Sequence, residues 1–143
     1  MRLVKDILKD KKLYYVKHDF SVMDTVKYMN ERNIGAIVVF KDNTLVGLFT
    51  ERDLMKLVEQ EVDLKNTQIE EVMRIGFIVA QHNETNVDCL KKMQKINCNY
   101  LPVVENDKYL GLISIRDLLE IEIKSLDGEL KQMESYLTYK MNN

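Results

Sequence analysis

The sequence contains one pattern twice, at a separation of 64 residues and without a gap. Residues 14–54 align with residues 78–118, and eleven of these 41 aligned positions are identical. The agreement is closest at the end of each repeat, where one copy has GLFTERDL and the other has GLISIRDL. A repeated unit of this size usually cannot bury its apolar face alone. We therefore expect two similar halves that pack together, and any site in one half should have a counterpart in the other.

The composition excludes several classes of protein. Acidic and basic residues are interspersed along the 143 residues, and the formal net charge is −2. A dedicated nucleic-acid-binding protein should instead show a concentrated basic face. The longest apolar run, Ala36–Phe40, is far too short to span a membrane, and the N-terminal residues show no secretory signal. We expect a cytoplasmic protein that binds neither nucleic acid nor membranes.

No set of residues predicts catalysis or metal binding. Cys89 and Cys98 form no CxxC pair and have no neighbouring histidine, so we interpret them as reduced, largely buried thiols. His18 and His82 occupy equivalent loop positions in the two repeats and do not form a ligand pair. Motifs for nucleophilic, zinc-dependent or phosphate-loop chemistry are missing. The sequence therefore predicts a protein that is not an enzyme, with no catalytic residue, no metal site and no required cofactor.

Each repeat has the same predicted order of elements, β-α-β-β-α. Apolar residues at helical spacing follow a hydroxyl residue that can start a helix, and two short apolar strands follow that helix. The predicted strands are 14–16, 36–40 and 45–49 in the first repeat, and 77–80, 100–104 and 109–113 in the second. A sheet covered by helices on one face leaves its other face apolar. We therefore predict an α+β fold in which two repeats form one sandwich with pseudo-two-fold symmetry.

The C-terminal residues carry a separate signal. Apolar residues recur at spacings of four and three, which is the heptad pattern of an amphipathic helix; they are Leu119, Ile123, Leu126, Leu130, Met133 and Leu137. Such a helix could pack on the body of its own chain or against a partner helix in a dimer. We divide the chain into a first repeat with its lead-in (1–61), a linker with the second repeat (62–123) and a helical tail (124–143).

The strongest candidate site is the strand, turn and helix start at Thr50–Asp53, repeated at Ser114–Asp117. The structural interpretation is a capping box, in which a hydroxyl and a carboxylate three residues later satisfy free backbone N–H groups. The functional interpretation is ligand binding. A helix N-terminus attracts phosphate, a carboxylate one turn further can hold a ribose diol, and Arg52 or Arg116 can add a donor for phosphate. The spacing alone leaves both interpretations open.

The full set of motifs resembles paired cystathionine β-synthase (CBS) domains, also known as a Bateman module. The resemblance rests on the two closing motifs, on lead-in segments at 4–8 and 69–73, and on the second-strand segments 33–39 and 97–103. It covers the chain from Leu3 to about Ile123, and the tail resembles that of small stand-alone bacterial members.

The resemblance implies a non-catalytic regulatory module that binds an adenosine-containing ligand in clefts between the repeats. AMP, ADP and ATP are the expected ligands, with S-adenosylmethionine or NAD as further candidates. The implied phosphate and ribose contacts are Thr50, Arg52 and Asp53 in one cleft and Ser114, Arg116 and Asp117 in the other. The implied frame of the adenine comprises Gly35, Ala36 and Ile37, with Tyr100, Leu101 and Pro102.

Three departures from the family pattern concern the ligand pocket: Val38 replaces a frequent proline, Tyr100 a common histidine, and Arg74 a frequent small hydroxyl residue. The resemblance further implies a homodimer that signals to an effector protein in trans. The alternative is a ligand-free module for dimerisation or protein interaction, in which the repeated boxes are only helix caps.

Overall fold

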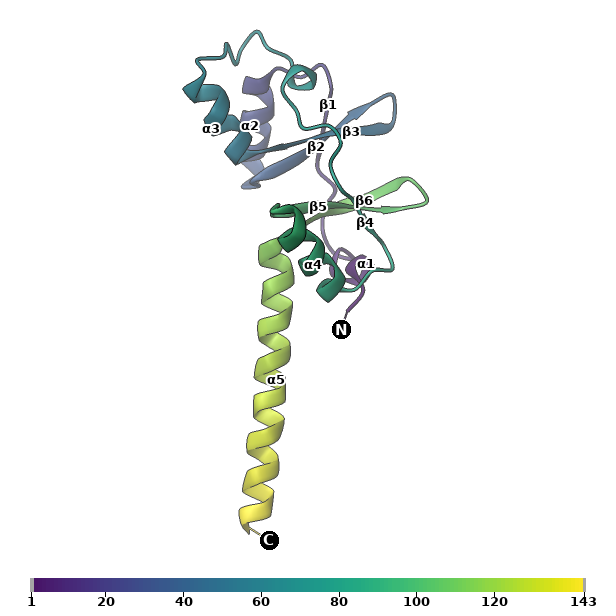
Figure 1. Cartoon of the computed structure of the whole chain (residues 1–143), viewed down its shortest axis with the longest axis vertical. Helices are drawn as coiled ribbons and strands as arrows, with labels where there is room; N and C mark the ends of the chain where they lie inside the picture. Colours follow the sequence, from purple (N-terminus) through teal and green to yellow (C-terminus); the bar gives the residue numbers. More distant parts are fainter. Residues whose placement is uncertain (1, 143) are drawn as a thin grey trace.

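The computed structural model describes residues 2–142 and shows two repeats followed by a long helix (Figure 1). The first repeat comprises β1 (Tyr15–Lys17), α2 (Val22–Arg32), β2 (Ala36–Lys41), β3 (Thr44–Thr50) and α3 (Glu51–Glu59). The second comprises β4 (Ala80–Gln81), α4 (Asn86–Ile96), β5 (Tyr100–Glu105), β6 (Lys108–Ser114) and the start of α5 (Ile115–Asn142). In each repeat the middle strand runs parallel to the first strand and antiparallel to the third. The predicted α+β fold and its order of elements are confirmed.

Local sequence explains where these elements begin and end. The side chains of Ser21 and Thr85 accept hydrogen bonds from backbone N–H groups at the starts of α2 and α4. Both helices end at an asparagine in the left-handed conformation, Asn33 or Asn97, which this residue type tolerates well. The two hairpins turn through pairs of Asn and Asp residues with positive φ, as tight hairpin turns require.

The two sheets pack face to face through a small apolar cluster. Val38 and Leu48 from the first sheet are buried together with Tyr109 from the second. The rings of Phe40 and Tyr109 meet edge to face, with centroids 5.6 Å apart. Each sheet has a second, larger core between its other face and its own helices. The predicted pseudo-symmetric sandwich is therefore present.

The lead-in segments cross over between the repeats. The short helix α1 (Val4–Ile7) lies beside the second repeat, where Val4 and Leu8 are buried in its core (Figure 1). The 3-10 helix η1 (Ile69–Glu71) instead supplies Ile69 to the core of the first repeat. Each half is thus completed by a segment that comes just before the other half in the sequence. The division of the chain after residues 61 and 123 remains a prediction.

The glycine of each closing motif makes room for these crossed lead-ins. A Cβ atom on Gly47 would lie 2.2 Å from the sulfur of Met73, and one on Gly111 would lie 3.1 Å from a methyl carbon of Leu8. Contacts this short force the neighbouring side chain to move. The glycine that precedes each hydroxyl therefore serves the packing of the repeat.

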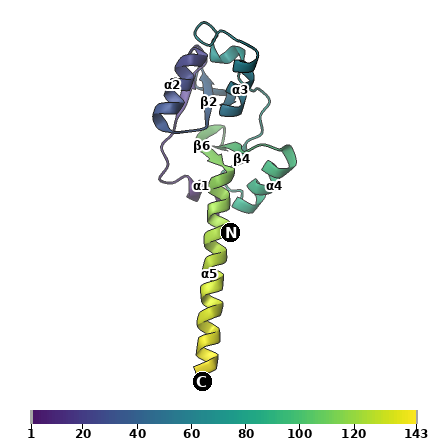
Figure 2. The same cartoon turned by 90° about the vertical axis from the view of Figure 1, so that its left-hand side faces the viewer.

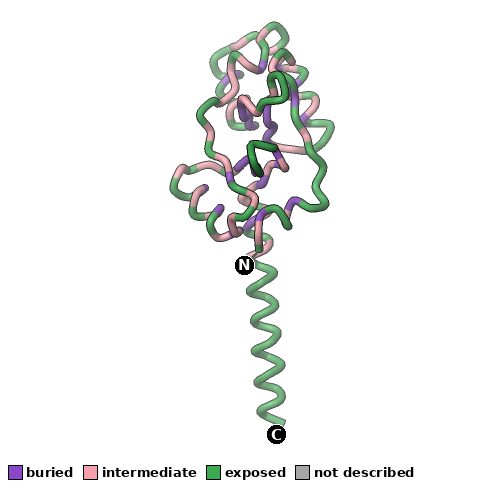
Figure 3. The backbone as a smooth tube through the Cα atoms, turned by 90° about the vertical axis from the view of Figure 1, so that its right-hand side faces the viewer, coloured by how far each residue is buried: buried purple, intermediate pink, exposed green. Residues whose placement is uncertain are grey.

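Helix α5 continues from the second repeat into the tail without a break and projects away from both repeats (Figures 1 and 2). All described residues from Ile123 to the end of the helix are exposed (Figure 3). The alternative in which the tail packs on its own body is therefore wrong for these residues. Within residues 2–142, no helix is both long and apolar enough to cross a membrane.

Candidate ligand-binding cleft

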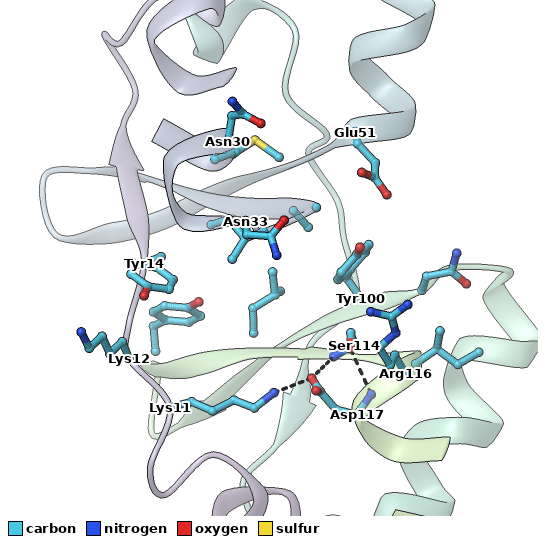
Figure 4. Close-up of a pocket in the computed structure, with 18 residues that line it drawn as sticks. Lys11, Lys12, Tyr14, Asn30, Asn33, Glu51, Tyr100, Ser114, Arg116 and Asp117 are labelled. Atoms are coloured by element: carbon cyan, nitrogen blue, oxygen red, sulfur yellow. Dashed lines mark hydrogen bonds and ion pairs between the residues drawn. The ribbon is translucent and has the colours of Figure 1, made fainter. Parts of the chain in front are cut away.

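A cleft of about 710 Å³ lies between the two repeats (Figure 4). The first repeat contributes the end of α2, the start of β2 and the first residue of α3. The second repeat contributes the start of β5, the end of β6 and the first turn of α5. The segment between α1 and β1 closes one side through Lys11, Lys12 and Tyr14. A volume of this size lies within the range of small-molecule and cofactor sites.

The closing motif of the second repeat lies in this cleft and forms a complete capping box. The hydroxyl of Ser114 accepts a hydrogen bond from the backbone N–H of Asp117 (3.1 Å), and the carboxylate of Asp117 accepts one from the backbone N–H of Ser114 (3.0 Å). The ammonium of Lys11 also contacts this carboxylate, with the nitrogen 2.6 Å from Oδ2. Burial raises the pKa of Asp117, but the hydrogen bonds from Lys11 and Ser114 outweigh it and bring the pKa below its ordinary value.

Tyr100 lines the cleft from the start of β5. A Cβ atom on Gly35 would lie only 2.6 Å from the Tyr100 hydroxyl oxygen and 3.2 Å from the carboxylate carbon of Glu51. Glycine at position 35 therefore allows the phenol and the carboxylate to approach the backbone. Burial raises the pKa of Tyr100, and the nearby Glu51 carboxylate adds to this effect. The phenol is thus a neutral hydrogen-bonding group at physiological pH.

The cleft carries more positive than negative charge. Three cationic side chains, Lys11, Lys12 and Arg116, line it together with two carboxylates, Glu51 and Asp117. Both lysines and Arg116 are exposed, so their charges can meet an entering ligand. The ring of Tyr14 and the end of α2 provide further lining. The cleft therefore combines an excess of positive charge with aromatic and amide surfaces.

The equivalent box in the first repeat has a different environment. Thr50 and Asp53 form the same reciprocal pair, with distances of 3.3 Å from Asp53 N to Thr50 Oγ1 and 3.0 Å from Thr50 N to Asp53 Oδ2. In addition, Arg74 donates from Nε to both carboxylate oxygens of Asp53 at 2.9 Å, and its Nη2 lies 2.8 Å from Oδ1. The guanidinium therefore already fills the carboxylate face that a ribose diol would use.

The backbone fixes Arg74 in this position. Its N–H donates to the carbonyl of Leu48 (2.8 Å), and the N–H of Leu48 donates to the carbonyl of Arg74 (3.0 Å). These two bonds attach Arg74 to β3, the strand that leads into Thr50. Lys11, by contrast, reaches Asp117 from the loop after α1 through a long and flexible side chain. A planar guanidinium thus holds Asp53 through several contacts, whereas Asp117 has a single contact with a lysine ammonium.

The structure separates the twelve predicted site residues into three groups. Six of them line the cleft: Gly35, Ala36, Tyr100, Ser114, Arg116 and Asp117. Thr50, Arg52 and Asp53 lie outside it, at the start of α3. Ile37, Leu101 and Pro102 are buried within β2 and β5. Whether any of them contacts a ligand remains a prediction.

Several residues of the cleft were missed by sequence reasoning. Lys11 and Lys12 lie shortly after the lead-in at residues 4–8. Their place in the cleft could be expected only once the lead-ins are known to cross to the other half. Glu51 occupies the position of Ile115 in the alignment, so the repeat gave no reason to single it out. Asn33 appeared only as the first residue of the second-strand segment 33–39, and Asn30 was not singled out.

A second cavity, of about 620 Å³, lies beside the two hairpin turns, and none of the predicted site residues lines it. Among the described residues 2–142, no group of three or more His, Cys, Asp or Glu side chains is placed to hold a metal ion. Cys89 is buried, and burial raises the pKa of its thiol to about 11. Both cysteines are free thiols, and Cys98 is only partly buried.

The fold and the cleft together define a class of proteins, in which paired β-α-β-β-α repeats enclose ligand-sized clefts. A structure in this class from Burkholderia ambifaria MC40-6, a protein with CBS domains, superposes with a TM-score of 0.81 and 34% identity over 86% of this chain and 95% of that one. The CBS domain pair of protein MJ0100 was solved with 5′-methylthioadenosine and S-adenosyl-L-methionine. It superposes with a TM-score of 0.77 and 28% identity, over 87% of this chain and 98% of that one.

The CBS domain family model matches the chain twice, at residues 4–60 and 69–124. This chain therefore belongs to the CBS domain family, as a tandem pair. Mitochondrial CBSX3 from Arabidopsis thaliana is 32% identical over 127 residues, which cover 83% of this chain and 61% of that protein. Arabinose 5-phosphate isomerase KdsD from Francisella tularensis is 29% identical over 110 residues, which cover 76% of this chain but only 34% of the enzyme. The chain thus spans less than two thirds of the length of these relatives.

Proposed function

We propose that this chain is a regulatory module that binds an adenine nucleotide in the cleft formed by Ser114 and Asp117. The observation that carries the proposal is the placement of this box. Its hydroxyl and carboxylate lie beside a ligand-sized cleft, and a single lysine, Lys11, pairs with the carboxylate. A capping box that served only the helix would not need an adjoining cleft with three cations.

Each part of a nucleotide has a matching group in the cleft. The N-terminus of α5, the Ser114 hydroxyl and Arg116 would bind phosphate. Asp117 would accept hydrogen bonds from the ribose diol after Lys11 moves away. The released ammonium would then remain close enough to pair with phosphate. The planar base would lie against the Tyr100 ring, which lines the cleft together with Gly35 and Ala36.

The charges favour a phosphate-bearing ligand. Lys11, Lys12 and Arg116 outnumber the two carboxylates of the cleft, and an excess of positive charge attracts phosphate groups. S-adenosylmethionine carries a sulfonium and an ammonium group instead. Although the MJ0100 pair holds S-adenosyl-L-methionine, we therefore expect AMP, ADP, ATP or NAD to bind this chain more tightly.

Regulation would follow from a change in population between two arrangements of a homodimer. A ligand can shift such an equilibrium only by its difference in affinity for the two states. The cleft lies between the repeats, so closing around a ligand would alter how the repeats are seated. We propose that this change is passed to an effector protein in trans, and that the module itself catalyses no reaction.

The test combines thermal unfolding and calorimetric titration with AMP, ADP, ATP, NAD and S-adenosylmethionine. A ligand at a hundred times its dissociation constant adds roughly 2.7 kcal/mol of stability, which raises the Tm by about 9 °C for a chain of this size. We expect this rise with a nucleotide for the wild type, and we expect Asp117→Ala to abolish it. Asp53→Ala is the matched control, because it removes the same type of cap and should retain the ligand response.

The second candidate is a ligand-free module for dimerisation or protein interaction. Both closing boxes are fully satisfied as helix caps, which is the observation that favours it. A flat response to the whole panel, with both variants only less stable, would support this candidate against nucleotide binding.

A further inference from the structure

The tail of α5 presents an apolar seam that no part of residues 2–142 covers. The seam comprises Ile123 (57% exposed), Leu126 (57%), Leu130 (56%), Met133 (62%) and Leu137 (57%). These residues alternate at spacings of three and four, so they occupy the a and d positions of a heptad repeat. Gly128 falls on the outer face of this helix, and a Cβ atom added there would meet nothing within 4 Å. The helix therefore has one continuous apolar face.

Acidic residues line both sides of this seam. With Ile123 at an a position, the flanking e and g positions between residues 120 and 136 are Glu120, Glu122, Asp127, Glu129, Glu134 and Tyr136. Five of these six side chains are carboxylates. Lys124 and Lys131 lie at b positions, away from the seam, and neither forms an ion pair with these acids in the part of the chain that the structure describes. Glu122 differs from the others because its carboxylate accepts a hydrogen bond from Asn86 in the second repeat.

This charge pattern opposes pairing with a second copy of the tail. In a parallel pair, g positions face e positions of the other helix, and in an antiparallel pair like positions face each other. Either arrangement would place carboxylates such as Glu129 and Glu134 against carboxylates. Like charges across a coiled coil destabilise it and serve to reject the wrong partner. The seam therefore fits a helix of opposite flanking charge better than it fits itself.

We propose that this seam docks an amphipathic helix of the effector protein whose apolar heptad positions are flanked by Lys and Arg. Burial of the apolar seam would supply affinity, and the acidic flanks would select the partner. From Ile123 to Leu137 the seam is about 21 Å long at 1.5 Å per residue, which accommodates two to three heptads of the partner. The tail emerges directly from Ser114 and Asp117 at the cleft, so one helix connects the proposed ligand site to the docking surface.

The docking proposal rests only on the part of the proposed function that concerns the effector protein. The test therefore uses no nucleotide. Helix docking and nucleotide binding can then each fail without the other. Two synthetic helical peptides share three heptads with leucine at a and d; one carries lysine at e and g, and the other glutamate. Fluorescence anisotropy measures the binding of each to the full chain at about 0.05 M and about 0.5 M salt. We expect the lysine peptide to bind at least about tenfold tighter at low salt, with the preference shrinking at high salt.

Variants of equal net charge separate the flanks from the overall charge. Glu129→Gln/Glu134→Gln should reduce the preference for the lysine peptide, whereas Ser125→Lys/Ser135→Lys adds the same charge on the outer face and should leave it intact. Leu130→Asp should abolish binding, and thermal unfolding checks that the repeats are unchanged in each variant. Equal binding of the two peptides would overturn the proposal. Sedimentation showing a dimer held by the tail at neutral pH, and lost in Leu130→Asp, would overturn it as well.

Discussion

The two closing boxes have the same hydrogen bonds but lie in different surroundings. In the second repeat, Ser114 and Asp117 line an open cleft, and one half-exposed lysine contacts the carboxylate. In the first repeat, Thr50 is buried and Asp53 is held by three contacts from Arg74. The capping geometry therefore does not distinguish a potential ligand site from a structural one. The segment that crosses from the other half makes that distinction.

A second difference between the repeats lies next to the pseudo-two-fold axis. Gly35 and Ala36 of the first repeat align with Asn99 and Tyr100 of the second. The missing Cβ of Gly35 is what lets the Tyr100 hydroxyl approach the backbone of the first repeat, since a Cβ there would lie 2.6 Å from it. Equivalent positions of the two repeats thus contribute residues of very different size to the same cleft. A duplicated fold can lose symmetry in its sites while keeping it in its backbone.

The largest effect should come from removing the guanidinium that occupies the first box. Arg74→Ser frees the carboxylate of Asp53. We therefore expect the stoichiometry, measured by calorimetric titration with the preferred nucleotide, to rise from one to two ligands per chain. Arg74→Lys is the conservative control, because a lysine at this position can still contact Asp53. Adding Asp53→Ala to Arg74→Ser should return the stoichiometry to one.

A stoichiometry that stays at one in Arg74→Ser would show that the Arg74–Asp53 ion pair is not what prevents a ligand from binding at the box of the first repeat. Binding of two ligands per wild-type chain would contradict the proposed difference between the two boxes.

The next effect concerns stability. Asp117→Ala removes a helix cap, which we expect to cost about 1 kcal/mol of unfolding free energy. Asp53→Ala removes an equivalent cap and also leaves Arg74 without its partner, so we expect about 2 kcal/mol. Urea unfolding of both variants, with Arg74→Ala and the double variant to complete a cycle, measures the coupling between Asp53 and Arg74. Equal losses in the two aspartate variants would show that the ion pair adds nothing to the cap.

Most of the fold could be predicted from the sequence because its signals are local. The hydroxyl residues that start helices, the Asn and Asp turns and the short apolar strands each act within a few residues, and the structure contains all of them. The crossed lead-ins could not be predicted in this way. Residues 4–8 and 69–73 have similar sequences, and nothing local states which core each one completes.

The candidate site shows the same limit. Ser114 and Asp117 could be identified from their spacing, but so could Thr50 and Asp53, and the spacing is identical. The residue that separates the two cases, Arg74, was noticed only as a departure from a family pattern. Its contact with Asp53 depends on backbone bonds to Leu48, which is a tertiary feature. Lys11 was missed for the same reason, because it approaches Asp117 from a segment about a hundred residues earlier in the chain.

The smallest effect is a pH dependence of stability, which reports how strongly Lys11 interacts with the carboxylate of Asp117. The pKa of Asp117 lies below its ordinary value of 3.8 in the folded chain, so the folded state favours the carboxylate. The stability that results is fully present above the ordinary pKa and is lost as the pH falls through the lowered folded-state pKa. We expect the difference in unfolding free energy between the wild type and Asp117→Asn to shrink over this acidic range. Urea unfolding at a series of pH values measures it.

Lys11→Met sharpens this measurement because it removes the lysine and keeps the length of the side chain. Without the ammonium, the folded-state pKa of Asp117 should move up towards its ordinary value, and the pH-dependent part of its stabilisation should shrink. The caps from Ser114 remain, so some dependence should persist. If Lys11→Met left the pH profile unchanged, the lysine would not hold the carboxylate in solution. The box of the second repeat would then differ even more from the box of the first repeat, because a ribose could bind Asp117 without displacing another side chain.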